Sequence, residues 1–171
     1  MKEEKARSNL WAPWRIDYIL GEKEDGCIFC NRLRLDNDRQ NLILVRKEKS
    51  FVIMNRYPYN NGHLIVAPNR HEGDIEKLKE DEILELFSLI QESTHALSMS
   101  MNPDGFNIGL NLGRVAGAGV EDHLHFHIVP RWNGDTNFMP VLGDVKVISE
   151  HLLSTYDKLE RTFKELNKEK K

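Results

Sequence analysis

Three histidines at alternating positions are the clearest candidates for chemistry in this chain. The stretch EDHLHFHIVPRW, residues 121–132, places His123, His125 and His127 two residues apart. Side chains two apart on a β-strand project from one face, so the pattern predicts a strand with three imidazoles on one side. Three imidazoles make a poor core face, because each ring brings two nitrogens that need partners. The pattern therefore indicates either a metal site or a catalytic histidine supported by its neighbours.

The only two cysteines, Cys27 and Cys30, also have the spacing of a metal site. Their stretch CIFC suits one tetrahedral zinc ion, which needs two further ligands. His71 and His123 are available as those ligands. The competing interpretations are a thioredoxin-like redox pair, two merely buried thiols, and a metal held by the three strand histidines. The residues alone do not choose among them.

Composition and charge narrow the class of protein. A chain of 171 residues, of which 30% are charged and 40% hydrophobic, predicts one globular domain with its own core. Its net charge of -3 argues against broad electrostatic binding to nucleic acid. No apolar run approaches the roughly 20 residues needed to span a bilayer, and the N-terminus has no apolar signal core. We therefore expect a cytoplasmic protein with neither nucleic acid nor membrane as a partner.

Alternating hydrophobic patterns predict five strands. They cover residues 41–46, 50–55, 63–68 and 106–113, and the histidine stretch. The third strand follows Asn-Asn-Gly, which is turn chemistry, and a glycine-rich loop precedes the histidines. Strands in meander order, with the helices set apart from them, indicate an α+β fold rather than a parallel α/β one.

Two other segments have the spacing of helices. Residues 80–100 carry one apolar stripe that includes Leu86, Ile90 and Leu97, and Asn-Pro-Asp-Gly ends it. Apolar residues from Ile148 to Phe163 predict a C-terminal helix before a frayed end. No repeat or linker divides the chain, which indicates a single domain with two tails.

Longer motifs around these residues resemble the histidine triad (HIT) superfamily. HLHFHIV resembles its triad motif, and FVIMNRYPYNNGHLIVAPNRH resembles its ribose-side strand pair. WAPWRIDYI, CIFC and PRWNGDTNFMPVLGDVKVI resemble the branch of diadenosine polyphosphate hydrolases and phosphorylases, which is related to fragile histidine triad proteins. The resemblance covers most of residues 11–153. It implies one HIT domain over residues 1–171, with tails at 1–10 and 165–171, built on an antiparallel sheet of about five strands.

The resemblance implies covalent catalysis by the middle histidine. His125 would attack the α-phosphorus of an adenosine polyphosphate such as diadenosine tetraphosphate, and water or phosphate would resolve the nucleotidyl-histidine. His127 and His63 match positions that contact the phosphates, stabilise developing charge or protonate the leaving group. The alternatives are a nucleotide-binding sensor or scaffold with weak catalysis, hydrolysis of nucleoside phosphoramidates, and a metal-dependent hydrolase that uses the triad as ligands.

Further residues match nucleotide-binding positions of the family. Asn55 matches the ribose-binding position, and Asn111 matches a position beside the phosphates. The backbone N–H groups of Gly117, Ala118 and Gly119 would face the phosphates, and Trp132 would stack near the leaving nucleotide. The chain departs from the family at Ala118 and Gly119, where relatives commonly have Gln or Ser that assists the leaving group.

The resemblance also implies a structural metal and an assembly. Family members that retain both cysteines resemble a closed zinc site of Cys27, Cys30, His71 and His123, which would hold the strand that carries the nucleophile. Relatives are dimers, which implies a homodimer built from the helix at 80–100 and the strand FNIGLNLG. The segment 11–20 would allow a higher assembly.

Overall fold

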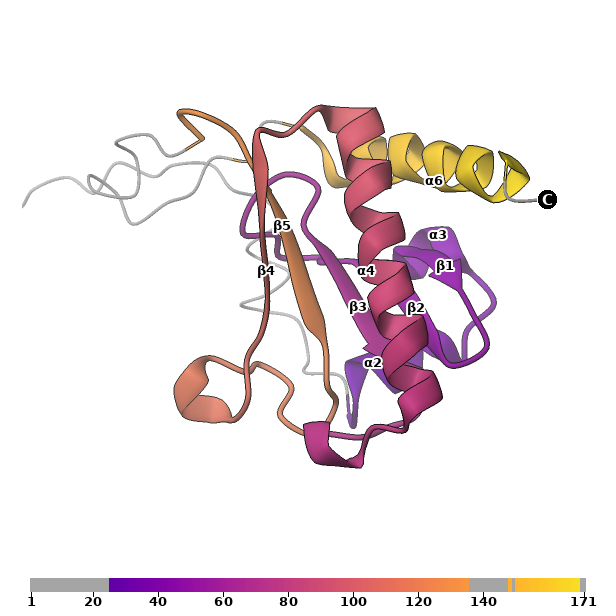
Figure 1. Ribbon diagram of the computed structural model, residues 1–171, viewed down its shortest axis with the longest axis vertical. Coiled ribbons are helices and arrows are strands. Elements are labelled where there is room, and N and C mark those ends of the chain that lie inside the picture. The colour runs from indigo at the N-terminus through magenta and orange to yellow at the C-terminus, as the bar shows by residue number, and fades with distance from the viewer. Residues whose placement is uncertain (1–24, 136–147, 149, 170–171) are drawn as a thin grey trace, which may run out of the picture.

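A five-stranded antiparallel sheet organises the computed structural model, which describes residues 25–135, 148 and 150–169 (Figure 1). Its strands are β1 (Ile43–Arg46), β2 (Ser50–Met54), β3 (Leu64–Pro68), β4 (Gly105–Leu110) and β5 (Phe126–Arg131). The helices are α2 (Ile28–Leu33), α3 (Asp38–Asn41), α4 (Glu80–Met101) and α6 (Leu152–Glu169), with short 3-10 helices at Ile75–Lys77 and Arg114–Ala116. The α+β class and the five strands that the sequence predicts are confirmed.

The order of the strands differs from the predicted meander. Strands β1, β2 and β3 do form a meander, but β5 lies between β3 and β4, so the sheet order is β1-β2-β3-β5-β4. Both β3 and β4 are antiparallel to β5 and therefore run in the same direction. The chain that connects β3 to β4 must therefore run back along the length of the sheet before β4 begins. The 22-residue helix α4, about 33 Å long at 1.5 Å per residue, spans that return.

The strand register separates the sheet into two faces. Val66 opposes Phe126 on β5, and the ring of Phe126 contacts Phe87 of α4 with 6.2 Å between centroids. Directly opposed residues share a face, so α4 covers this side, as Figure 1 shows. Ile65 opposes His127 on the other side. The sheet therefore carries its hydrophobic helix layer on one face and its histidines on the opposite face.

The two long helices each bury one apolar stripe. On α4 the buried residues include Leu86, Leu89 and Leu97. On α6 the ring of Tyr156 is buried and its hydroxyl donates to the carbonyl of Ile43 at 2.8 Å, which ties this helix to β1. Within the part of the chain that the structure describes, no helix is both long and apolar enough to cross a membrane.

Three element boundaries differ from those that the periodicity predicts. Strand β4 ends at Leu110, and β5 begins only at Phe126. Helix α6 continues to Glu169, into the segment 165–171 for which the sequence predicts a tail. The reason is that Leu166, 7% exposed, extends the buried stripe by one more turn. The expected tail at 1–10 and the segment 11–20 lie outside the described residues.

Candidate functional site

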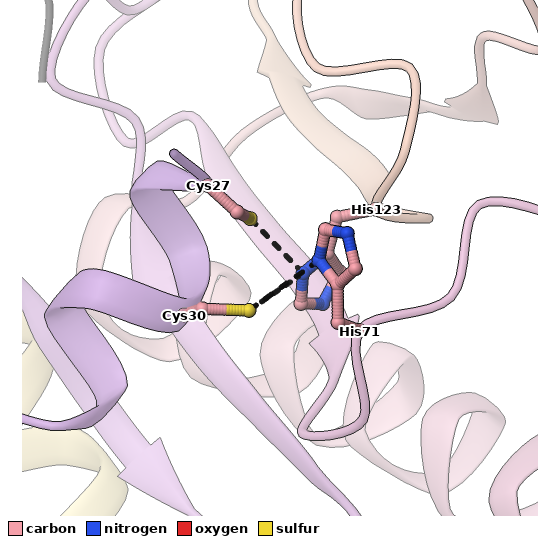
Figure 2. A group of neighbouring side chains, drawn as sticks. All are labelled: Cys27, Cys30, His71 and His123. Atoms are coloured by element: carbon pink, nitrogen blue, oxygen red, sulfur yellow. Dashed lines mark hydrogen bonds between the residues drawn. The ribbon is translucent and has the colours of Figure 1, made fainter. Parts of the chain in front are cut away.

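Four side chains converge where α2 meets the loop after β3 and the segment before β5 (Figure 2). The ligand atoms of Cys27, Cys30, His71 and His123 all lie within 4.8 Å of one another. The sulfur of Cys27 is 3.3 Å from Nδ1 of His123, and the sulfur of Cys30 is 3.4 Å from Nδ1 of His71. Neighbouring ligands of a tetrahedral zinc ion are about 3.3–3.8 Å apart, given its bond lengths. The arrangement therefore fits a tetrahedral metal ion.

The second nitrogen of His123 supports the same conclusion. Its Nε2 donates to the carbonyl of Pro68 at 2.8 Å, in a fully buried position, which leaves Nδ1 unprotonated and directed at the cysteines. A metal-binding histidine usually has such a partner on its other nitrogen. Burial also raises the pKa of the Cys30 thiol, so a bound cation would be needed to favour the thiolate.

The structure also separates the three triad histidines by role. His123 belongs to the four-residue group, whereas His125 and His127 do not. Nδ1 of His125 donates to the backbone carbonyl of His123 at 2.8 Å, and Nδ1 of His127 is 3.0 Å from Nε2 of His63. The triad thus does not gather around one metal. The prediction of three rings on one strand needs correction, because His123 and His125 precede the paired residues of β5.

His125 has the features of a nucleophile. Because its Nδ1 carries the hydrogen that bonds the carbonyl of His123, its Nε2 keeps a lone pair. Nε2 has no hydrogen-bond partner among the residues that the structure describes. Burial lowers the pKa of His125 below its ordinary value of about 6.5, so the imidazole is neutral at pH 7. The ring is held against Phe29 of α2, with 5.0 Å between centroids.

A short hydrogen-bond chain sets the protonation of His127. The backbone N–H of Tyr59 donates to Nδ1 of His63 at 3.1 Å, and the amide nitrogen of Asn55 is 3.2 Å from the same atom. Nδ1 of His63 is therefore unprotonated, and its Nε2–H donates to Nδ1 of His127 at 3.0 Å. This leaves the hydrogen of His127 on Nε2. Burial, followed by the neighbouring His125, lowers the pKa of His127 to about 4, so the ring is a neutral donor.

The nucleophilic nitrogen suggested for His125 and the donor nitrogen of His127 belong to adjacent rings. The centroids of His125 and His127 are 4.9 Å apart, and the ring planes are nearly perpendicular. One ring offers a lone pair on Nε2 and the other offers Nε2–H. A nucleophile and a hydrogen-bond donor on adjacent rings suit transfer of a phosphoryl-type group.

The predicted nucleotide-binding residues lie beside His63 and around the glycine-rich loop. The amide oxygen of Asn55 accepts from the N–H of Tyr57 at 2.9 Å, so both ends of this side chain lie beside protein partners. Asn111 donates to the carbonyl of Gly117 at 3.4 Å, across the glycine-rich loop. The N–H groups of Gly117 and Ala118 donate to carbonyls within that loop. Gly119 forms no such hydrogen bond among the described residues.

Trp132 lies apart from the histidines. Its indole N–H donates to the carbonyls of Met101 and Asn102 at 3.3 and 3.2 Å, at the C-terminal end of α4. It lines a cavity of about 750 Å³ that includes Glu150 and none of the triad histidines. Helix α4 covers the face of the sheet opposite the histidines, so this position suits packing against the helix.

Two aromatic contacts of the site were not predicted from the sequence. Phe29, which is 2% exposed, packs against both His123 and His125. Tyr59 stacks on His63 with 4.8 Å between centroids and supplies the N–H that orients it. The sequence shows Phe29 only as an apolar residue between two cysteines and Tyr59 only as an aromatic residue before a turn. Neither feature identifies the histidine that the side chain contacts.

Comparison with known proteins places the site in a family. A model described as the HIT domain matches residues 37–134, a span that begins just before α3 and ends after β5. An AP-4-A phosphorylase from Mycobacterium tuberculosis is 36% identical over 155 residues, which cover 85% of this chain and 79% of the relative. The bis(5'-adenosyl)-triphosphatase of Dictyostelium discoideum is 30% identical over 129 residues, or 75% of this chain and 85% of that protein.

The structural comparison agrees. A hypothetical histidine triad nucleotide-binding protein from Sulfolobus tokodaii superposes with a TM-score of 0.64 at 26% sequence identity. The match covers 84% of this chain and 93% of that chain. Similarity therefore extends beyond the triad motif to the arrangement of the sheet and helices.

The lowered pKa of His127 predicts loss of stability in mild acid. Because the pKa is about 4 in the folded chain and about 6.5 when unfolded, the unfolded chain takes up the proton first. This contribution is complete above pH 6.5 and is lost as the pH falls towards 4. His127→Asn, which keeps an acceptor for His63, should flatten the fall in the free energy of unfolding, measured by urea titration between pH 7 and 5. Exposed His95→Asn is the control, and equal slopes in both variants would contradict the assignment.

Proposed function

The chain belongs to the HIT domain family, and from that membership we propose that it cleaves adenosine polyphosphates, such as diadenosine tetraphosphate, at the α-phosphate. The observation that carries the proposal is the tautomer of His125, whose Nδ1–H bonds the carbonyl of His123 and leaves Nε2 as a nucleophile. The relatives named AP-4-A phosphorylase and bis(5'-adenosyl)-triphosphatase support this substrate class. A purely binding role is not favoured, because it would not require a nucleophile and a hydrogen-bond donor on adjacent rings.

In the first step, Nε2 of His125 attacks the α-phosphorus. The N–P bond forms as the P–O bond to the leaving polyphosphate breaks. The carbonyl of His123 stabilises the positive charge that develops on the imidazole, since it accepts from Nδ1–H throughout. The polyphosphate leaves as an anion, and the Nε2–H of His127 donates a hydrogen bond that stabilises the charge on the leaving oxygen, while His63 holds the other side of that ring.

In the second step, an acceptor oxygen attacks the same phosphorus and its proton is lost to solvent. The N–P bond breaks with its electron pair returning to Nε2, which restores His125. Phosphate as the acceptor yields a nucleoside diphosphate, and water yields a monophosphate. We favour phosphate, because the AP-4-A phosphorylase matches more of this chain at higher identity than the triphosphatase does. The side chain of Ala118 has no donor where family members commonly have Gln or Ser, so the hydrogen bond to the leaving oxygen falls to His127.

The nucleotide itself would contact residues around this pair of rings. Asn55 lies beside His63 and would turn its amide to the ribose hydroxyls on binding. Asn111 and the loop at 117–119 would bind the phosphates. Stacking by Trp132 stays a prediction from the family, and its position against α4 does not support it.

We assign the four-residue group to a structural zinc ion. Two thiolates and two imidazole nitrogens are the donor set that tetrahedral zinc prefers, and four protein ligands leave no position for substrate. Zinc bound there would stabilise the fold by joining α2 to the loop after β3 and to the segment before β5. We expect the protein in the cytoplasm, where thiols stay reduced and available as ligands.

The outer surface of α4 and the edge strand β4 support a homodimer. Leu84 and Phe87 are 66% and 57% exposed on α4, and Ile108 is 48% exposed on β4. Ile108 opposes Ile128 and so lies on the same side of the sheet as α4. Because β4 is at the edge of the sheet, a second copy could pair with its free backbone groups while it covers the apolar side chains. A higher assembly through residues 11–20 stays a prediction.

Replacing the nucleophile tests the reaction. His125→Ala should still bind nucleotide but lose turnover by roughly a thousandfold or more, because no other group can form the covalent intermediate. Diadenosine tetraphosphate with inorganic phosphate should give ADP and ATP with the wild type, and a rapid quench should trap an adenylyl group on His125. His95→Ala, at an exposed position of α4, is the control. Turnover near the wild-type rate in His125→Ala would refute the proposal.

Metal removal tests the zinc assignment. Elemental analysis should find one zinc ion per chain, and Cys27→Ser should release it and lower the melting temperature, because the metal contributes directly to folding. Chelator treatment of the wild type should reproduce the loss, and added zinc should reverse it. Pure protein that holds no zinc, even after expression with zinc supplied, would contradict the assignment.

Charge on the apolar surface tests the dimer. Light scattering across a dilution series should give the wild type twice the chain mass of 19.9 kDa at micromolar concentration. Leu84→Glu should give a single chain, because burying an unpaired carboxylate in the interface is unfavourable. Arg161→Glu, at an exposed position of α6, should leave the mass unchanged. A wild type of single-chain mass would refute the dimer.

A further inference from the structure

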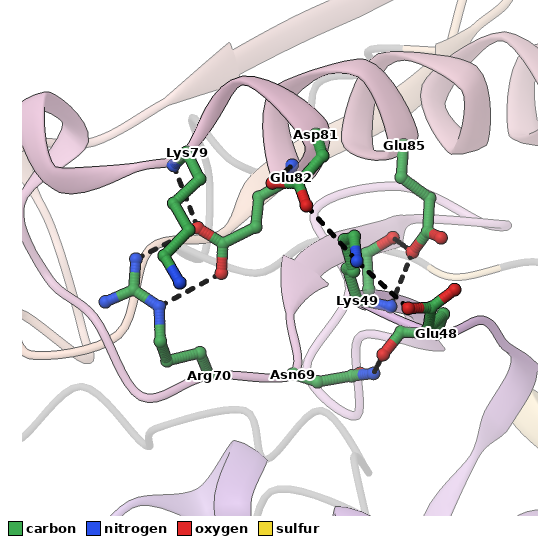
Figure 3. A network of polar contacts seen from close by, with 9 residues as sticks. Glu48, Lys49, Asn69, Arg70, Lys79, Asp81, Glu82 and Glu85 are labelled. Atoms are coloured by element: carbon green, nitrogen blue, oxygen red, sulfur yellow. Dashed lines mark hydrogen bonds and ion pairs between the residues drawn. The ribbon is translucent and has the colours of Figure 1, made fainter.

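Arg70 stands immediately before the metal-site residue His71 and connects this loop to α4 (Figure 3). Its Nε and Nη2 donate to the two carboxylate oxygens of Glu82 at 3.0 and 2.9 Å, a bidentate pair. Nη1 donates to Glu72 at 2.8 Å, and Nη2 also donates to the carbonyl of Lys77 at 2.9 Å. Four of the five guanidinium N–H donors therefore have partners that lie in three different places along the chain.

Glu82 is a rigid anchor for this pair. Its side chain is 8% exposed, and it accepts from the backbone N–H of Lys79 at 2.9 Å, which caps the first turn of α4. The Arg70 guanidinium lowers the pKa of this carboxyl to about 2, so Glu82 stays charged. Paired, charged hydrogen bonds from a guanidinium to a fixed carboxylate define both distance and direction.

Glu72 connects the same guanidinium to the histidine segment. One carboxylate oxygen accepts from Arg70 and the other from the N–H of Asp74 at 3.1 Å. The backbone carbonyl of Glu72 accepts from the N–H of Leu124, between His123 and His125, at 2.7 Å.

The next residue in the loop shows how closely the two segments approach. A Cβ on Gly73 would lie 2.7 Å from the carbonyl oxygen of Glu121 and 2.9 Å from Cα of Asp122. These contacts are with backbone atoms, which cannot move aside as the end of a flexible side chain can. The loop that carries His71 thus fits against the residues before His123 without room for adjustment.

We propose that Arg70 is a positioning residue that holds the His71 loop in the geometry of the metal site and, through Glu72, orients the segment that carries the nucleophile. The metal part rests on the zinc assignment, and the effect on turnover rests on the proposed reaction. Lysine cannot replace this guanidinium, because an ammonium cannot bind Glu82 at two points and reach Glu72 and Lys77 as well. Small displacements of a reacting group cost large factors in rate.

A solely stabilising ion pair is the alternative, and the chain contains a matched example. Arg39 binds Asp157 through two hydrogen bonds of 2.9 and 3.0 Å and ties α3 to α6. Its side chain is 55% exposed and it touches neither the metal group nor the triad. Arg39→Gln therefore measures what the loss of a bidentate pair does to folding alone.

The test measures zinc affinity by competition with a chromogenic chelator, without nucleotide present, on the full chain. Arg70→Gln should bind zinc about tenfold more weakly than the wild type, which is the lower range for residues that support metal ligands. The zinc affinity of Arg70→Lys should lie between those of the wild type and Arg70→Gln. This variant also keeps the test decisive if Arg70→Gln does not fold. Arg39→Gln should bind zinc as the wild type does. Wild-type zinc affinity in Arg70→Gln or Arg70→Lys would overturn the proposal.

Two further measurements separate positioning from general stability. Glu82→Gln retains an acceptor for Lys79 but loses the charge, so its effect on zinc affinity and that of Arg70→Gln should not add in the double variant. With diadenosine tetraphosphate, kcat of Arg70→Lys should fall while KM stays unchanged. Additive effects on zinc affinity would count against the proposal. A wild type that binds zinc and cleaves no adenosine polyphosphate would refute the proposed reaction, while the zinc measurements would still decide the role of Arg70.

Discussion

The need of buried imidazoles for hydrogen-bond partners governs this site. His63, His123 and His125 are almost completely buried, and a buried ring nitrogen without a partner is costly. Pro68 and His123 supply carbonyls to His123 and His125, and the N–H of Tyr59 occupies one side of His63. Each bond selects one tautomer. The same bonds that make burial possible therefore leave a lone pair on His125 and a hydrogen on His127.

The four-residue group and the pair His125 and His127 share one short piece of backbone. His123 belongs to the first, and its carbonyl holds His125 of the second. Phe29, between the two cysteines, packs against both rings. A metal at the four-residue group would hold the orientation of the nucleophile without touching the substrate. This arrangement would link a closed metal site to the proposed reaction.

Helix α4 has three connected roles. It brings the chain from β3 to β4 on the far side of β5, covers the core face of the sheet, and offers Glu82 at its first turn to Arg70. Its outer residues Leu84 and Phe87 stay exposed. The proposed interface between copies thus lies on the same helix that anchors the loop carrying His71, on the face of the sheet opposite the histidines.

Local patterns in the chain already define much of this protein. Alternation marks the strands, helical spacing marks α4, and the spacing of His123, His125 and His127 marks the segment proposed to be reactive. The residues alone left the convergence of the Cys27–Cys30 pair with His71 and His123 as one of several alternatives, and only the family resemblance chose it. Periodicity indicates which face of a strand or helix a residue lies on, but not which other segment of the chain the residue contacts. The insertion of β5 between β3 and β4, the hydrogen-bond chain from Tyr59 to His127, and the contacts of Arg70 therefore follow from folding, which joins residues distant along the chain.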